Sequence, residues 1–303
     1  MFDVTIIGSG VAGMTAALYA LRSNKKVLII EKESYGGQIA KSPKVENYPT
    51  KKSVSGAQLT DEIFDQITDL GVMFELENVE KIEKKDNYFV VTTDYNTYDS
   101  KTVIIANGVK SRTLNLENED KLLGKGVYYC AICDGPFFAG KDVVLVGDGN
   151  SAMQYALMLA DYCNKVTMVT MFDKFFGEYA LEESIRANSK IEIIPNAVAS
   201  ALIGDKELEE VEFTSSDSSK FSIKTNALFV AIGQVPDNKK FENVVDLDKA
   251  GYIIANETCK TKTDGLFVAG DCRVKNIRQV ATAMGDGAVA GTEAVNYINT
   301  HKG

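Results

Sequence analysis

The sequence is poor in the residues that hold metal ions and structural disulfides. Its 303 residues include one histidine, His301, and five cysteines, of which only Cys130 and Cys133 lie close together. A tetrahedral zinc site or an iron–sulfur cluster needs four ligands, usually in two close pairs, so we predict no metal. Scattered cysteines cannot build a disulfide framework, and we expect buried, unreactive thiols at Cys163, Cys259 and Cys272.

Basic charge and long apolar runs are also scarce. The formal net charge is −9 at pH 7 and the isoelectric point is about 4.9. Nucleic acid and anionic membranes require a basic face, so neither is an expected partner. No apolar run reaches membrane-spanning length, and the first residues have the pattern of a strand rather than of a signal peptide. We therefore expect a cytoplasmic protein.

A dinucleotide-binding fingerprint opens the chain. Residues 2–7 are a predicted buried strand, Gly8-Ser9-Gly10-Val11-Ala12-Gly13 is a glycine turn, and an apolar helix is predicted over 14–21. A second predicted strand, 27–30, ends in Glu31, roughly twenty residues beyond the turn, as the fingerprint requires. The glycines let the backbone approach a pyrophosphate, and Glu31 can accept hydrogen bonds from ribose hydroxyls. This context favours nucleotide binding over a purely structural turn.

A redox motif lies near the middle of the chain. Cys130-Ala131-Ile132-Cys133 places two thiols where they can close a small disulfide ring, and Asp134 follows directly. In a cytosolic chain such a pair does redox work more often than structural work. Adjacency places Asp134 where it could act as a general acid and base on a thiol, and the alternative is a helix or turn cap.

A second strand–glycine turn–helix unit follows the cysteine pair. Residues 143–149 are a predicted strand and turn, a helix is predicted over 151–162, and a strand over 166–169. This order repeats that of the N-terminus. A polar crossing at 110–121 indicates a domain boundary before it. The chain therefore has an α/β pattern with two nucleotide-binding-like units.

These motifs, in this order, resemble the low-molecular-weight thioredoxin reductases over the whole chain. Residues 8–13 and Glu31 correspond to that family's FAD pyrophosphate and ribose motif. Residues 35–39 and 45–49 resemble its flavin-side loops. Asp271 and residues 277–281 resemble its C-terminal FAD motif, and Cys130 to Gly135 resemble its active-site motif.

The resemblance implies a fold, a cofactor and an assembly. It implies two Rossmann-like three-layer domains with the second inserted into the first: an FAD-binding domain at 1–112 and 242–303, and a redox-active disulfide domain at 113–241. It also implies a homodimer, and it assigns Cys133 as the thiol nearest the flavin and Cys130 as the one that attacks thioredoxin. The implied FAD contacts are Gly8, Ser9, Gly10, Val11, Ala12, Gly13, Glu31, Lys32, Gly36, Gly37, Gln38, Asn47, Ala106, Gly108, Asp271, Arg278, Gln279 and Val280.

One departure from the family concerns the electron donor. Members that use NADPH carry a His-Arg-Arg run and a further Arg beyond the second strand of the inserted domain, where guanidinium groups bind the 2′-phosphate. The aligned residues here are Thr170, Met171 and Phe172, followed by Asp173-Lys174-Phe175-Phe176. Asp148 also places a carboxylate inside the turn, and Val169-Thr170 offers no acid for an NADH ribose. A packing role for residues 147–152 is therefore favoured, and we expect NADPH not to bind.

The same loss marks the ferredoxin-dependent flavin thioredoxin reductases, the subgroup that the chain resembles most. The leading hypothesis is therefore a reductase that passes electrons from reduced ferredoxin to thioredoxin. The alternatives are an NAD(P)H-dependent thioredoxin reductase with an atypical nucleotide site, and a flavin-binding redox sensor without turnover. Ferredoxins are typically acidic, so the pairs Lys25-Lys26, Lys51-Lys52 and Lys239-Lys240 are candidates for a docking patch, although such pairs are usually only solvated surface. For Phe137-Phe138 and Phe175-Phe176, core packing is favoured over a flavin cover.

Overall fold

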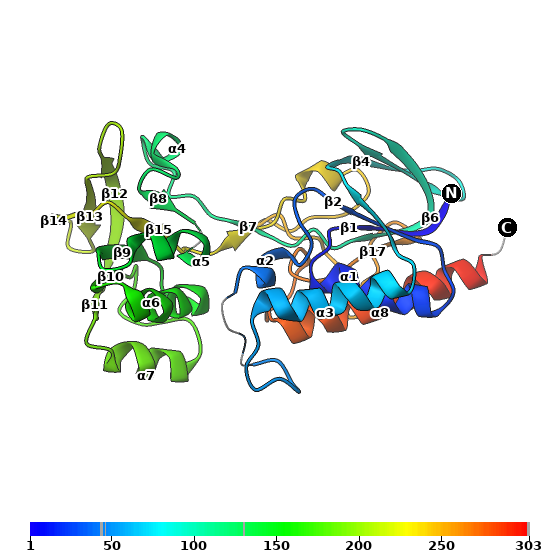
Figure 1. Ribbon diagram of the computed structural model, residues 1–303. Helices are drawn as coiled ribbons and strands as arrows, with labels where there is room; N and C mark the ends of the chain where they lie inside the picture. The colour runs from blue at the N-terminus through cyan, green and yellow to red at the C-terminus, as the bar shows by residue number, and fades with distance from the viewer. Residues whose placement is uncertain (43–44, 46, 130, 302–303) are drawn as a thin grey trace. The chain divides into compact units, whose positions relative to one another are not determined.

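The computed structural model describes residues 1–42, 45, 47–129 and 131–301 (Figure 1). The chain divides into two compact units: Met1–Lys110 with Val235–Gly303, and Ser111–Gln234. The chain passes between them twice, and the short strands at these crossings, β7 (Lys110–Ser111) and β16 (Gln234–Val235), pair with each other. None of the helices in the described ranges combines the length and the apolar character that a membrane crossing needs.

The second boundary lies seven residues before the position expected from the sequence, 241/242, and the first lies two residues before 112/113. Residues 235–241 belong with the first unit for two reasons. The Asn238 side chain donates hydrogen bonds to the carbonyls of Gly251 (2.9 Å) and Cys272 (2.8 Å). Phe241 is fully buried in a core cluster of the first unit. The two hydrogen bonds of Asn238 join residues 13 and 34 positions apart in the chain, so the sequence around Pro236 does not indicate them.

The first unit is built on a seven-stranded sheet of order β3-β2-β1-β6-β5-β4, with β17 paired to the second half of β6. Strands β3, β2, β1, β6 and β17 are parallel, whereas β4 and β5 form an antiparallel meander on β6. Helices α1, α3 and α8 cover one face (Figure 1). The bounds are β1 Phe2–Ile7, α1 Val11–Arg22, β2 Val27–Glu31, α2 Gly37–Ala40, α3 Gly56–Asp69, β3 Met73–Leu76, β4 Val79–Lys84, β5 Phe89–Thr93, β6 Thr97–Ile105, the 3₁₀ helix η2 Lys239–Phe241, β17 Leu266–Val268 and α8 Val280–Thr300.

Alternating and continuous apolar runs explain this sheet. β1 and β2 are buried along nearly their whole length, and β2 is Val, Leu and Ile up to Glu31, as expected of central parallel strands. α3 buries Leu59, Ile63 and Ile67 at helical spacing, while Leu70 caps the helix and is 42% exposed. α8 packs on α1 through small residues. A Cβ at Gly287 would lie 2.3 Å from the Ala12 carbonyl oxygen, so only glycine allows this approach.

The second unit repeats the plan with a five-stranded parallel sheet, β11-β10-β9-β15-β8, and an antiparallel three-stranded sheet, β12-β13-β14. α6 packs on one face of the parallel sheet, and residues of β12 and β13 pack on the other. The bounds are α4 Glu119–Leu122, β8 Val127–Tyr128, α5 Ala131–Asp134, the 3₁₀ helix η1 Gly135–Phe138, β9 Asp142–Val146, α6 Asn150–Tyr162, β10 Lys165–Val169, α7 Tyr179–Ala187, β11 Ile191–Ile194, β12 Ala197–Ile203, β13 Glu210–Ser215, β14 Lys220–Lys224 and β15 Leu228–Val230.

Candidate functional site

Three glycines shape the turn between β1 and α1, each for a different reason. Gly8 has a φ of +101°, and a Cβ there would lie 2.4 Å from the Ala106 carbonyl oxygen. At Gly13 a Cβ would lie 2.0 Å from the Gly8 oxygen, so this glycine is needed for the helix to pack on the strand. Gly10 differs, because no described atom lies within 4 Å of its Cβ position. The three glycines of a dinucleotide fingerprint have these same separate roles, and the middle one leaves room for a pyrophosphate.

Glu31 lies directly beside this turn. Its Oε2 accepts hydrogen bonds from the backbone amide (2.9 Å) and the hydroxyl (3.0 Å) of Ser9. The end of β2 therefore presents a carboxylate at the turn, where it can also accept hydrogen bonds from a ribose. The Gly36 amide donates to the Ser9 carbonyl (2.9 Å), and a Cβ at Gly37 would lie 3.1 Å from the Gly10 Cα. The glycine turn at residues 8–13, Glu31 and the loop residues Gly36 and Gly37 thus lie together.

The ends of β6 and β17 bring further predicted residues to the same unit. The Ala106 amide donates to the Ile7 carbonyl (2.8 Å), and the Ala269 amide to that of Ile105 (2.9 Å). Two oxygens near these strand ends, Oδ1 of Asn107 and Oδ1 of Asp271, are buried and have no hydrogen-bond partner in the structure. Buried polar atoms are rarely left without a partner. A cofactor rich in hydroxyl groups, such as FAD, fits this pair of acceptors. Asn107 escaped the sequence analysis, although it lies between two predicted contacts.

The remaining predicted contacts are more dispersed. Asn47 donates to the Gln279 side chain (3.0 Å), which joins the second flavin-side loop to the start of α8. Gln38 lies 3.5 Å from the Val109 carbonyl oxygen. The Arg278 guanidinium lies 4.2 Å from the centre of the Tyr252 ring, and its Nε lies 3.4 Å from the Asp271 carbonyl oxygen. Lys32 is at the surface beside Glu33. Val280, the first residue of α8, is half-buried, and Gly108 is open to its surroundings.

The redox motif is only partly described. Cys130 lies outside the described residues, and Cys133 lies in the short helix α5, with nothing described of its side chain. Burial raises the pKa of Asp134, which lies at the end of the same helix. Immediately before the motif, the Tyr129 hydroxyl donates to the buried carboxylate of Glu119. The hydrogen bond of Tyr129 thus holds the start of the motif, and the Asp134 carboxyl is partly buried.

The three isolated cysteines are buried free thiols, as the sequence predicts. The phenylalanine pairs give a mixed result. Phe138 is buried, as core packing predicts, but Phe137 is 74% exposed and Phe176 is 51% exposed. The core-packing prediction was wrong for these two: Phe137 lies in the short 3₁₀ helix η1 and Phe176 in the loop between β10 and α7, so neither belongs to a strand that packs in the core. The sequence around each pair does not indicate which phenylalanine is buried and which is exposed.

The raised pKa of Asp134 leads to a kinetic prediction. If Asp134 takes the proton from the neighbouring thiol, it must be ionised, so the rate should fall as the pH drops through its pKa. Because burial raises that pKa, the fall should occur above the usual range of an aspartate. Asp134→Asn should remove this acid limb and slow thiol-dependent turnover at pH 7 by about 100-fold. Rates measured between about pH 4 and 8 test this, and an unchanged acid limb in the variant would assign the limb to another group.

The second glycine turn, between β9 and α6, is built like the first. The Gly147 amide donates to the Val169 carbonyl (3.1 Å), just as that of Gly8 donates to Ile30 (2.8 Å). The Phe176 amide donates to the Asp148 carbonyl (2.8 Å), just as that of Gly36 donates to Ser9. Gly149 forms an isolated parallel β-bridge with Phe176, just as Gly10 does with Gly36. The two turns can therefore be compared position by position.

The comparison shows three differences between the two turns. Asp148 stands where the first turn has Ser9, and burial raises the pKa of this carboxyl. Thr170 stands where the first turn has Glu31. It is 2% exposed, and its hydroxyl donates to the Phe172 carbonyl (2.7 Å). Phe176 stands where the first turn has Gly36. Its ring forms an edge-to-face pair with that of Phe172, with centroids 5.4 Å apart.

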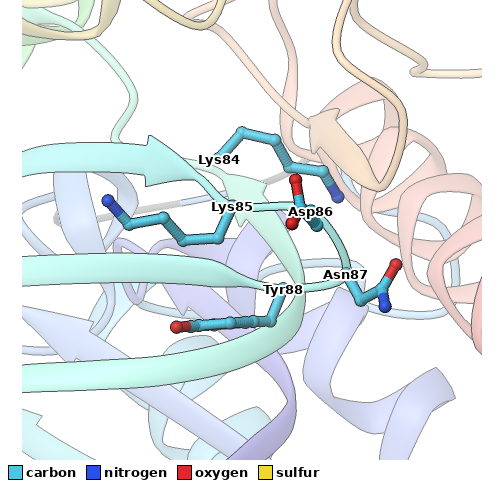
Figure 2. Close-up of a pocket in the computed structure, with 5 residues that line it drawn as sticks. All are labelled: Lys84, Lys85, Asp86, Asn87 and Tyr88. Atoms are coloured by element: carbon cyan, nitrogen blue, oxygen red, sulfur yellow. The ribbon is translucent and has the colours of Figure 1, made fainter.

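A hollow at the β4–β5 turn lies apart from these residues. Figure 2 shows the five residues that line it, Lys84 to Tyr88, with Lys84 and Lys85 pointing in opposite directions. The Lys84 ammonium is buried 4.2 Å from the centre of the Phe89 ring, where cation–π attraction replaces a hydrogen bond. Burial lowers the pKa of Lys84. This hollow contains none of the predicted site residues. Within the described ranges, no three His, Cys, Asp or Glu residues are grouped as a metal site would need.

Two Rossmann-like units, one with an FAD-type glycine turn and one with a Cys-x-x-Cys motif, define a nucleotide-linked disulfide oxidoreductase class. The chain belongs to the pyridine nucleotide-disulphide oxidoreductase family, whose model matches residues 2–287.

Three similar proteins illustrate this membership. A "34.2 kDa protein in rubredoxin operon" of Clostridium pasteurianum is 38% identical and covers 98% of this chain and 97% of its own length. A thioredoxin reductase of Lactococcus lactis has a TM-score of 0.97 at 32% identity, covering 99% and 100% of the two chains. A ferredoxin-flavin thioredoxin reductase of Clostridium acetobutylicum has a TM-score of 0.54 at 30% identity, covering 99% and 98%. These structures confirm the predicted α/β fold with two Rossmann-like units.

Proposed function

We propose that the chain is an FAD-dependent thioredoxin reductase that takes electrons from reduced ferredoxin and delivers them through the Cys130–Cys133 disulfide to thioredoxin. The similar proteins support thioredoxin reduction, and their titles include both an ordinary and a ferredoxin-linked enzyme. The observation that carries the donor is the second glycine turn, in which Asp148, Thr170 and Phe176 replace residues that suit a dinucleotide.

The first unit would hold FAD. Its pyrophosphate would lie at residues 8–13, where Gly10 leaves room, and Glu31 would accept hydrogen bonds from its ribose. The buried oxygens of Asn107 and Asp271 would accept hydrogen bonds from its hydroxyl groups. FAD, when bound, accepts electrons one at a time and stores two, which suits a one-electron donor and a two-electron disulfide acceptor. The other proposed contacts are Lys32, Gly36, Gly37, Gln38, Asn47, Ala106, Gly108, Arg278, Gln279 and Val280.

The cysteines would perform thiol–disulfide exchange. The Cys130 thiolate attacks one sulfur of the thioredoxin disulfide, forms a mixed disulfide and releases the other thioredoxin sulfur as a thiolate. Cys133 then attacks the sulfur of Cys130, restores the Cys130–Cys133 disulfide and releases the second thioredoxin thiol. Asp134 would take the proton from Cys133 and return it. We also infer, from the family resemblance, that two copies associate as a homodimer in the cytoplasm.

Anaerobic titration of the purified, FAD-loaded protein tests the donor. Reduced ferredoxin should bleach the flavin absorbance, whereas NADPH and NADH should leave it unchanged at about 1 mM, the upper end of usual KM values. Dithionite serves as the control that the flavin is reducible. Rapid bleaching by either nucleotide would contradict a ferredoxin-specific donor site and favour an NAD(P)H-dependent reductase with an atypical site.

A further inference from the structure

A buried ion triad lies at the turn that carries Asp271. The Asp286 carboxylate, on α8, accepts hydrogen bonds from Arg273 Nε (2.8 Å) and Nη2 (2.7 Å) and from Lys275 Nζ (2.9 Å). The three side chains are between 6% and 9% exposed. Burial alone would raise the pKa of Asp286, but Arg273 and Lys275 outweigh this, so its pKa is lowered.

The triad is attached to the backbone of the same turn. Asp286 Oδ2 also accepts a hydrogen bond from the Gly270 amide (3.0 Å), the residue before Asp271. A Cβ at Gly270 would lie 2.8 Å from the Cβ of Ala12, in the first turn of α1. Asp286 therefore holds the Gly270–Asp271 turn against the same helix whose start forms the first glycine turn.

The charges of the triad do not balance on their own. Arg273 and Lys275 carry two positive charges, and Asp286 carries one negative charge. Two further acids act on these charges. Glu257 favours the charged form of Arg273. Lys275 and Arg278 favour the charged form of Asp271, although burial raises its pKa. Ion groups buried in this way are seldom better for stability than apolar residues of equal volume, so stability alone does not account for them.

We propose that Asp286, Arg273 and Lys275 position Asp271 for FAD: Arg273 and Lys275 hold the Asp286 carboxylate in place, and Asp286 fixes the Gly270–Asp271 turn. This inference rests on the proposed role of Asp271 in holding FAD. No pattern in the sequence indicates this role, because Arg273 and Lys275 have the spacing of surface charges. Asp286 stands between Gly285 and Gly287 in α8.

The test is the dissociation constant of FAD, measured from flavin fluorescence on dilution of the holoenzyme. Lys275→Met keeps most of the length of the buried side chain but removes its charge, and should weaken FAD binding about tenfold, within the usual range for coupled buried groups. Lys275→Arg should remain within about threefold of the wild type because it restores the charge. Lys262→Met is the matched control, because it breaks an exposed ion pair with Asp246 in the same unit. It should leave the dissociation constant unchanged.

A double-mutant cycle separates positioning from direct attraction of the anionic cofactor. If Lys275 acts through Asp271, adding Lys275→Met to Asp271→Asn should weaken binding little beyond Asp271→Asn alone. An equal loss in both backgrounds, or no loss from Lys275→Met, would overturn the inference. Wild-type affinity in Asp271→Asn would instead overturn the proposed role of Asp271 itself. Thermal unfolding of each FAD-saturated variant shows whether the fold is retained.

Discussion

Cys130→Ser should lower the rate of thioredoxin reduction by at least about 1000-fold, because a hydroxyl at neutral pH cannot replace a thiolate nucleophile. Binding of FAD and reduction of the flavin by ferredoxin should persist, since the glycine turn, Glu31 and Asp271 all lie in the other unit. The measurement is thioredoxin turnover with reduced ferredoxin, repeated with a chemical donor so that the result does not depend on the donor proposal.

Cys133→Ser distinguishes the roles of the two thiols. Cys130 should still attack thioredoxin, but no neighbouring thiol can resolve the mixed disulfide, so a covalent complex should accumulate and be visible by mass. Cys163→Ser is the matched control, because Cys163 is a buried free thiol whose sulfur lies 3.4 Å from the Phe138 carbonyl oxygen. It should retain activity. Turnover that survives in Cys130→Ser would remove the pair from the mechanism and favour a flavin-binding redox sensor.

The parts of the fold that the sequence predicts are those fixed by local patterns. The strand, glycine turn and helix at residues 2–22 were predictable because each residue has a local role: apolar strand, left-handed Gly8, tight Gly13. Helix α7 and strands β11 and β12 were not predicted. α7 buries little more than Ile185, and most residues of β11 and β12 are partly or fully exposed, so their apolar periodicity is weak.

The parts of the site that the sequence could not give depend on contacts between distant segments. Glu31 and Asp271 carry motif signals, but the partners that fix Asp271 are separated from it by the turn into α8 and only meet in three dimensions. The equivalence of Phe176 and Gly36 is similar. The segments around Phe176 and Gly36 have no sequence pattern in common. Only the β-bridges, Phe176 with Gly149 and Gly36 with Gly10, show that the two residues occupy the same position in the two turns.

That equivalence leads to the second large expected effect, at Gly10 and Gly149. Both residues have φ and ψ values that alanine adopts without strain, −68° and 176° at Gly10 and −97° and 177° at Gly149. Neither Cβ would meet a described atom closer than 3.8 Å. Alanine should therefore leave folding intact at both positions. Any difference between the two variants must come from what approaches the turn.

We expect Gly10→Ala to weaken FAD binding by at least about tenfold, because the added methyl group occupies the space that a pyrophosphate needs, and overpacking of this kind costs about 1–3 kcal/mol. Gly149→Ala should leave ferredoxin-driven turnover unchanged if the second turn holds no nucleotide. Loss of turnover in Gly149→Ala, with FAD still bound, would show that the second turn takes part in catalysis.

Gly13→Ala completes the series as the variant that should fail for a structural reason. Its Cβ would lie 2.0 Å from the Gly8 carbonyl oxygen, so α1 must move away from β1 or the turn must open. We expect a lower yield of folded protein and a loss of unfolding free energy of about 3 kcal/mol or more, at the upper end of overpacking costs. Gly10→Ala should keep the unfolding midpoint of the wild type when both are measured without FAD. A matching loss of stability in Gly10→Ala would mean that protein atoms, and not a cofactor, require glycine there.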